Sequence, residues 1–168
     1  TEGEELWAVP AAGAMAWENV TPVESGDPNT VALLVGDDRV AAPLWLYVGE
    51  KNAIGDGSFL DRNGLAYGAL HVWVADDGSL SPEDWNGTGT SRTGTFIEIA
   101  HYDAAMAGMP GYDARGFADQ DTQDALAAAA GAFQFSRPED VATNPENGTQ
   151  VVMASTGRAS LYPSDNWG

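Results

Sequence analysis

The sequence predicts an all-β protein built from antiparallel sheets with one short helix, and three observations support this fold class. Short apolar runs rich in β-branched and aromatic residues recur along the chain. Gly, Asn and Asp pairs typical of tight turns separate these runs. The spacing favours strands joined directly to one another over strands that alternate with helices. We therefore expect strands at 31–35, 44–48, 69–74, 95–100, 132–135, 150–154 and 158–162.

The strands group into two sets. The four runs between residues 31 and 100 predict one four-stranded sheet, and a hairpin after Glu139 begins another, with Asn147-Gly148 as its turn signal. Repeated sheets of this kind are typical of β-propeller blades, although a β-sandwich leaves a similar pattern. We expect a blade-like sheet at about 25–102 and the start of the next blade at about 132–168. About two blades do not close a propeller, so the chain either pairs with other segments or forms a smaller β structure.

The segment 104–131 is expected to be an insertion between the two sheets that carries the helix. Residues 118–130 contain Gln, Leu and a run of alanines, all of which have high helix propensity. Gly131 can end the helix, and three aspartates near its start suit the helix dipole.

Composition limits the classes of function. The chain has 168 residues, is 43% hydrophobic and carries a net charge of -18, from 25 acidic and 7 basic residues. This field disfavours nucleic acid and anionic membranes as partners, and it fits either solvation in a salty medium or binding of divalent cations. The lack of cysteine excludes disulfide, thiolate-zinc and Cys-nucleophile chemistry. No apolar run is long enough to span a membrane, and a first residue other than Met indicates a processed or excised chain.

Two glutamates are the main candidates for metal ligands. Pro138 fixes its own φ and favours an extended Arg137, so the Glu139 side chain is presented with little residual freedom. Glu18 lies far upstream beside Trp17, in a stretch whose small residues allow a close backbone approach. If the two carboxylates meet, they form a hard, oxygen-rich cation site. The alternatives are a Glu139 paired with Arg137 and a Glu18 that is an ordinary surface acid.

Four further residues are candidates for supporting roles around that site. Asp37 and Asp38 follow Gly36, and the Gly-Asp-Asp sequence is either a metal-associated segment or an ordinary turn. Asp140 and Arg137 flank the Pro138-Glu139 pair and could stand behind Glu139. His71 and His101 are interpreted as structural because no second histidine lies at ligand spacing, and the 52–63 stretch, which lacks EF-hand spacing, as a loop.

Three segments in a fixed order resemble the PhoX-type alkaline phosphatase family. They are 13–20 with Glu18, 35–48 with Gly-Asp-Asp and a Tyr-containing strand, and 137–145 with Arg-Pro-Glu. The resemblance implies a six-bladed propeller with calcium and iron in an axial tunnel, and Glu18 and Glu139 as ligands from two blades. It covers almost the whole chain but only part of a full-length member. The iron-ligating cysteine of the family belongs upstream, and this chain has no cysteine, so iron needs ligands from outside it.

The resemblance implies a secreted, periplasmic or extracellular enzyme that hydrolyses phosphate monoesters with the help of metal ions. The chain would then supply part of the active-site tunnel, and the remaining propeller segments or a partner chain would complete it. Two alternatives stay open. One is a non-catalytic, calcium-binding β-propeller that binds a ligand or a surface partner. The other is a propeller hydrolase of a different ester, such as a lactone, that uses one calcium ion.

Overall fold

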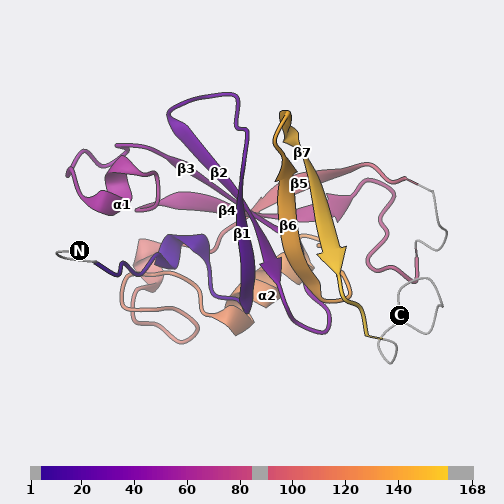
Figure 1. Cartoon of the computed structure of the whole chain (residues 1–168). Coiled ribbons are helices and arrows are strands. Elements are labelled where there is room, and N and C mark those ends of the chain that lie inside the picture. Colours follow the sequence, from indigo (N-terminus) through magenta and orange to yellow (C-terminus); the bar gives the residue numbers. More distant parts are fainter. Residues whose placement is uncertain (1–4, 85–90, 159–168) are drawn as a thin grey trace.

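A five-stranded antiparallel sheet is the largest element of the computed structural model, which describes residues 5–84 and 91–158 (Figure 1). Its strands are hydrogen-bonded neighbours in chain order. They are β1 (Trp17–Val23), β2 (Thr30–Asp37), β3 (Trp45–Glu50), β4 (Gly68–Ala75) and β5 (Gly94–Ile99). The predicted all-β class with antiparallel sheets is confirmed.

Strand β1 was not predicted, and it lies before the expected blade boundary at residue 25. It occupies one edge of the sheet, where Pro22 pairs with Leu33. Proline cannot donate a backbone hydrogen bond, so it weakens the strand signal in the sequence but is tolerated at a sheet edge. The division of the chain into two blades remains a prediction.

The second sheet is the hairpin of β6 (Pro138–Asn144) and β7 (Asn147–Ser155), which lies beside β1 in Figure 1. The hairpin was predicted, but its turn was misplaced by two residues. Asn144 pairs with Asn147, so Pro145 and Glu146 form the turn and the Asn-Gly pair starts β7. The hairpin is attached to the main sheet by side-chain hydroxyls. Thr143 Oγ1 donates to the carbonyl of Pro22 (2.7 Å), and Thr21 Oγ1 donates to the carbonyl of Val141.

The predicted strand at 132–135 is wrong. Its backbone forms hydrogen bonds with four separate segments in place of one neighbouring strand. The donors and acceptors are Ala132 N to Ala127 O, Phe133 N to Trp73 O, Gln134 N to Leu80 O, and Phe135 paired with Ala42. Phe133 and Phe135 are buried against Trp73, so their apolar pattern reflects core packing. Most of the strand predicted at 158–162 lies outside the described residues.

The core lies on both faces of the main sheet. Val72 belongs to the larger cluster, which includes Trp45 and Tyr47, and its neighbour Trp73 belongs to the smaller cluster with Phe133. Successive residues of a strand point to opposite faces, so the two clusters cover opposite sides. The larger cluster also contains residues of η1 (Pro10–Ala12) and of helix α2 (Gln120–Ala129).

Helix α2 (Gln120–Ala129) confirms the predicted helix. Asp119 caps its start by accepting a hydrogen bond from Thr122 N (3.0 Å), and Gly131 follows its end with a φ of 79°. The other helical elements are single turns: α1 (Phe59–Arg62) and η2 (Ala104–Met106). Among residues 5–84 and 91–158, no helix is long and apolar enough to cross a membrane.

Candidate functional site

Three strand ends bring together most of the acidic residues that the sequence singled out. Glu18 lies at the start of β1, Asp38 directly follows β2, and Glu139 lies at the start of β6. The register between β1 and β2 shifts between Trp17 and Asn19, so Glu18 lies in a β-bulge. Bulges redirect side chains at strand ends and are frequent beside active sites.

A glycine allows β6 to approach β2. A Cβ atom placed on Gly36 would lie 1.7 Å from the carbonyl oxygen of Glu139, which is far inside van der Waals contact. Only a residue without a side chain can stand at this crossing. Gly36 therefore allows Glu139 to lie next to the end of β2, which Asp37 closes and Asp38 follows.

Arg137 stands between two of the acidic side chains. Its Nε donates to Asp38 Oδ1 (2.8 Å) and its Nη2 donates to Asp38 Oδ2 (3.0 Å), a two-point pair. The same Nη2 lies 2.8 Å from Glu139 Oε1. Glu139 Oε1 also accepts a hydrogen bond from Thr156 Oγ1 (2.6 Å). Glu139 therefore pairs with Arg137, as in the alternative to metal binding considered from the sequence.

The charges around Arg137 include Glu18. The hydrogen bond to Asp38 is the largest cause that raises the pKa of Arg137, and the negative charges of Asp38, Glu139 and Glu18 raise it further. In return, the Arg137 guanidinium lowers the pKa of Asp38. Glu18 itself is exposed, whereas the Glu139 side chain is 17% exposed and the Arg137 side chain 35%. The two predicted ligands therefore lie within the electrostatic reach of one guanidinium.

The backbone at Arg137 corrects one expectation. The residue before a proline was expected to be extended, but Arg137 has a φ of 55°, in the left-handed region that non-glycine residues rarely adopt. Proline disfavours the right-handed helical region for its predecessor but leaves the extended region open, so Pro138 does not by itself require the left-handed backbone. In this conformation Arg137 pairs with Asp38 and Glu139. Such a conformation costs about 1–3 kcal/mol and is often found at functional sites.

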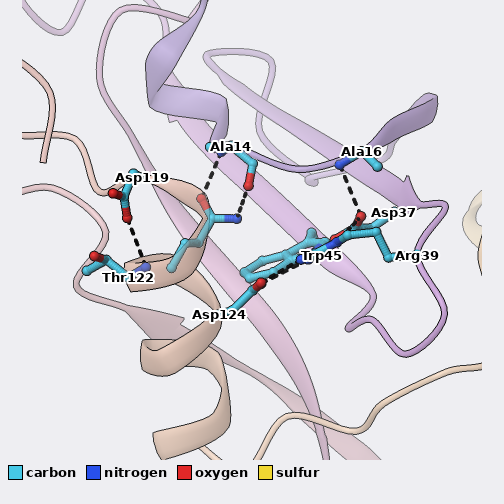
Figure 2. Close-up of polar contacts among 9 residues, drawn as sticks. Ala14, Ala16, Asp37, Arg39, Trp45, Asp119, Thr122 and Asp124 are labelled. Carbon is cyan, nitrogen blue, oxygen red and sulfur yellow. Dashed lines mark hydrogen bonds and ion pairs between the residues drawn. The ribbon is translucent and has the colours of Figure 1, made fainter. Parts of the chain in front are cut away.

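Asp37 belongs to a different set of contacts from Asp38 (Figure 2). Its buried carboxylate accepts hydrogen bonds from Ala16 N (3.1 Å), Trp45 Nε1 (3.1 Å) and Arg39 Nε (2.8 Å). Arg39 also pairs with Asp124 of α2. Asp37 is therefore fully engaged in holding neighbouring segments together.

The remaining candidates do not join the group around Arg137. Asp140 is exposed on β6. His101 is buried, its Nε2 lies 2.8 Å from the carbonyl oxygen of Ala11, and burial lowers its pKa, which fits the predicted structural role. Asp61, in the predicted 52–63 loop, is buried and accepts hydrogen bonds from the backbone N–H groups of Ile54 and Gly55 (both 2.9 Å).

The donor atoms suit a hard cation in type but not in number. Carboxylate oxygens are the ligands that calcium prefers, usually six to eight oxygens at about 2.3–2.6 Å. Within the described part of the chain, no three or more His, Cys, Asp or Glu side chains are grouped so that they could hold a metal ion. The described residues alone therefore do not provide the full ligand set of such a site.

Several features of this site were missed by sequence reasoning. The two-point pair of Asp38 with Arg137 joins residues 99 positions apart, and the contact of Thr156 with Glu139 joins residues 17 apart. The one available signal was Gly36, a glycine inside an apolar strand pattern, which often marks a close backbone approach.

The fold and the site define an antiparallel β protein with carboxylates and an arginine gathered at its strand ends. Comparison with known protein families identifies the family to which this protein belongs. Residues 7–164 match the family described as alkaline phosphatase PhoX, and the chain belongs to that family.

A solved structure supports the same assignment. The chain is similar to Pseudomonas fluorescens PhoX in complex with vanadate, a transition state analogue, with 28% sequence identity and a TM-score of 0.58. The similarity covers 85% of this chain and 23% of that one, so the chain spans about a quarter of the solved protein. No curated protein matches the chain.

Proposed function

We propose that the protein containing this chain hydrolyses phosphate monoesters and that this chain supplies part of its metal-dependent active site. Family membership and the similarity to a vanadate-bound PhoX support the reaction class. At the level of residues, one observation carries the proposal: Arg137 pairs with both Asp38 and Glu139 where two strands end, close to Glu18.

Arg137 is the residue of this chain best suited to bind the phosphoryl group. Its Nε and Nη2 are engaged by Asp38, and Nη2 also faces Glu139. Among the described residues no partner is assigned to Nη1, which can donate to a phosphoryl oxygen. Planar guanidinium groups match phosphate geometry well, and the fixed orientation of Arg137 lowers the entropic cost of that contact.

Glu18 and Glu139 would hold metal ions, with Asp38, Asp37, Asp140 and Arg137 in supporting positions. Calcium fits the carboxylate oxygens, and iron would need further ligands from outside the chain. Bound metal ions would polarise the phosphoryl oxygens and lower the pKa of a bound water. The chain's own contribution is to hold these carboxylates at adjoining strand ends and to aim Arg137 between them.

The charge of the chain explains why metal ions are needed. A phosphate monoester is a dianion, and a chain with a net charge of -18 repels it. Cations held by Glu18 and Glu139 would reverse the local sign at the site and so would favour the approach of the substrate. One arginine between two carboxylates does not offset this field by itself.

The proposal extends to partners and location. The missing metal ligands would come from the remaining segments of a propeller or from a partner chain, because the solved relative is about four times as long as the matched stretch. The phosphomonoester is the substrate, and neither nucleic acid nor membrane insertion is expected. We place the protein in the periplasm or outside the cell, on the basis of family membership alone.

The test uses the full-length protein and a simple aryl phosphate. We expect phosphate release that depends on added metal and is abolished by chelation. Glu139→Gln keeps the shape of the side chain but removes its charge, so it should lose most of the activity and weaken calcium binding measured by calorimetry. Glu146→Gln is the matched control because Glu146 is an exposed acid in the turn of the same hairpin, and it should behave like the wild type.

The net charge of -18 also fits one other function, a calcium-stabilised binding protein without catalysis. In that case chelation would lower the melting temperature, but no metal would produce phosphate release. A lactone or another ester that is hydrolysed in place of the phosphate would indicate the third alternative. Full phosphatase turnover in excess chelator would contradict the proposed function.

A further inference from the structure

Two neighbouring residues of α2, Gln123 and Asp124, bind two different segments that lead into the candidate site. Gln123 is completely buried, and its side-chain amide makes two hydrogen bonds with one residue. Its Oε1 accepts from Ala14 N (2.9 Å) and its Nε2 donates to Ala14 O (3.1 Å), as the dashed lines to Ala14 in Figure 2 show. A Cβ atom on Gly13 would lie 2.8 Å from Gln123 Oε1, so this fit depends on a glycine there.

Asp124 holds the other segment through Arg39. Arg39 Nη1 lies 2.5 Å from Asp124 Oδ2, and Arg39 Nη2 lies 2.9 Å from Asp124 Oδ1. The same guanidinium binds both oxygens of Asp37, with Nε at 2.8 Å from Oδ1 and Nη2 at 2.5 Å from Oδ2. Arg39 is thus a bridge between α2 and the end of β2 (Figure 2).

Both contacts lie next to acidic residues of the candidate site along the chain. Ala14 and Ala16 precede Glu18 by four and two positions, and Asp37 and Arg39 flank Asp38. The two segments are also tied to each other, because Asp38 N donates to Ala16 O (3.0 Å). A shift of α2 would therefore move the backbone on which the acidic side chains stand.

We propose that Gln123 and Asp124 of α2 are positioning residues that set the relative placement of Glu18 and Asp38. The inference rests on the proposed function, because it assigns the helical insertion a task in that same site. The side chains of Gln123 and Asp124 bond to Ala14 and Arg39, so their effect on Glu18 and Asp38 is indirect. Partners that orient ligands in this way typically change metal affinity about 10- to 100-fold.

The decisive variant is Asp124→Asn in the full-length protein. It keeps the size of the side chain but removes the charge that pairs with Arg39. We expect calcium binding, measured by calorimetry, to weaken about tenfold, and the calcium concentration for half-maximal phosphate release to rise by the same factor. The turnover number should recover at saturating calcium, because the acidic side chains themselves are intact.

Two further variants sharpen the comparison. Asp121→Asn removes the same charge from an exposed position of the same helix, so it should leave calcium binding within about twofold of the wild type. Arg39→Lys keeps the charge but cannot bridge two carboxylates, so it should resemble Asp124→Asn. If Asp124→Asn fails to fold, Asp124→Glu is the second variant, because it keeps the charge but displaces the ion pair with Arg39. We expect Asp124→Glu to weaken calcium binding as well.

The outcomes separate this inference from the proposed function. If the wild type releases phosphate and the Asp124 variants bind calcium as Asp121→Asn does, the positioning role is wrong and the function stands. If the wild type binds calcium but releases no phosphate, and Asp124→Asn still weakens binding, the function is wrong and the positioning role stands. A wild type that binds no calcium overturns both.

Discussion

Replacing Gly36 by alanine is the sharpest test of how the site is built. Gly36 lies in β2 where β6 crosses it, and an added Cβ would meet the carbonyl oxygen of Glu139 at 1.7 Å and its carbonyl carbon at 2.8 Å. Both atoms belong to the backbone, so no side-chain rotation can relieve the contact. The strands must separate until the distance exceeds 3.0 Å, the lower limit for real Cβ contacts.

The cost follows from what that separation breaks. Overpacking a close contact typically costs about 1–3 kcal/mol. The hydroxyls of Thr21 and Thr143, which donate to backbone carbonyls across the same interface, lose their geometry at about 1 kcal/mol each. We expect a total destabilisation of about 3–5 kcal/mol and, because Glu139 moves away from Asp38, a weaker metal site.

The assay combines denaturation with calcium binding by the full-length protein. The control is Val152→Ala in β7 of the same hairpin, because the side chain of Val152 is 74% exposed. Substitution of such a surface residue should change the stability by less than about 1 kcal/mol. A Gly36→Ala protein as stable as the control, with unchanged calcium affinity, would refute the close crossing of β2 and β6.

Three further predictions address other parts of the chain. Arg137→Lys keeps a positive charge but loses the two-point geometry of the guanidinium. The rate of phosphate release should therefore fall on the order of 100-fold, while the melting temperature changes little. An unchanged rate would rule out phosphate binding by Arg137. Burial raises the pKa of Tyr47 to about 12, and its hydroxyl donates to Gly64 O (2.8 Å). Because the fold favours the neutral phenol, Tyr47 contributes fully to the stability of the fold below pH ~10, the pKa of an unfolded tyrosine, and this contribution is lost as pH rises towards 12. In denaturation curves, Tyr47→Phe should therefore reduce the loss of stability at alkaline pH. An equally large loss in the variant would show that another group causes it. Asp119→Ala removes the cap of α2 and should cost about 1 kcal/mol in chemical denaturation, whereas no change would mean that the cap is dispensable.

The sequence predicted the elements whose signals are local. The strands of the main sheet after β1 follow runs of apolar, β-branched residues, and α2 follows its propensities and its closing glycine. The errors have local causes as well. The segment 132–135 is apolar because it fills the core, and periodicity alone does not distinguish a buried loop from a short strand. The hairpin turn was misplaced because Asn147-Gly148 is a strong turn signal two residues away from the actual turn.

The site was predictable only in part, because its contacts are set by tertiary structure. Glu18 and Glu139 were singled out as acids that could converge, and both influence the same guanidinium. Nothing local, however, indicates that Arg137 adopts a left-handed backbone or that it takes Asp38 as its main partner. Both features depend on how the hairpin docks against β2, a long-range contact that no pattern within either segment encodes.

The two arginines at the end of β2 differ in a way that matters for function. Arg39 bridges Asp37 and Asp124 in a setting where the Asp37 carboxylate is completely buried and accepts several hydrogen bonds. Breaking such a pair leaves an uncompensated buried charge, so this side of the strand is held in one arrangement. Arg137 bridges Asp38 and Glu139 with all three side chains partly exposed, where ion pairs are weak and water can replace a lost partner. The Asp37–Arg39–Asp124 contacts can therefore serve as the support, while Arg137, oriented by Asp38 and Glu139 through Nε and Nη2, would present Nη1 to the phosphoryl group of the proposed substrate.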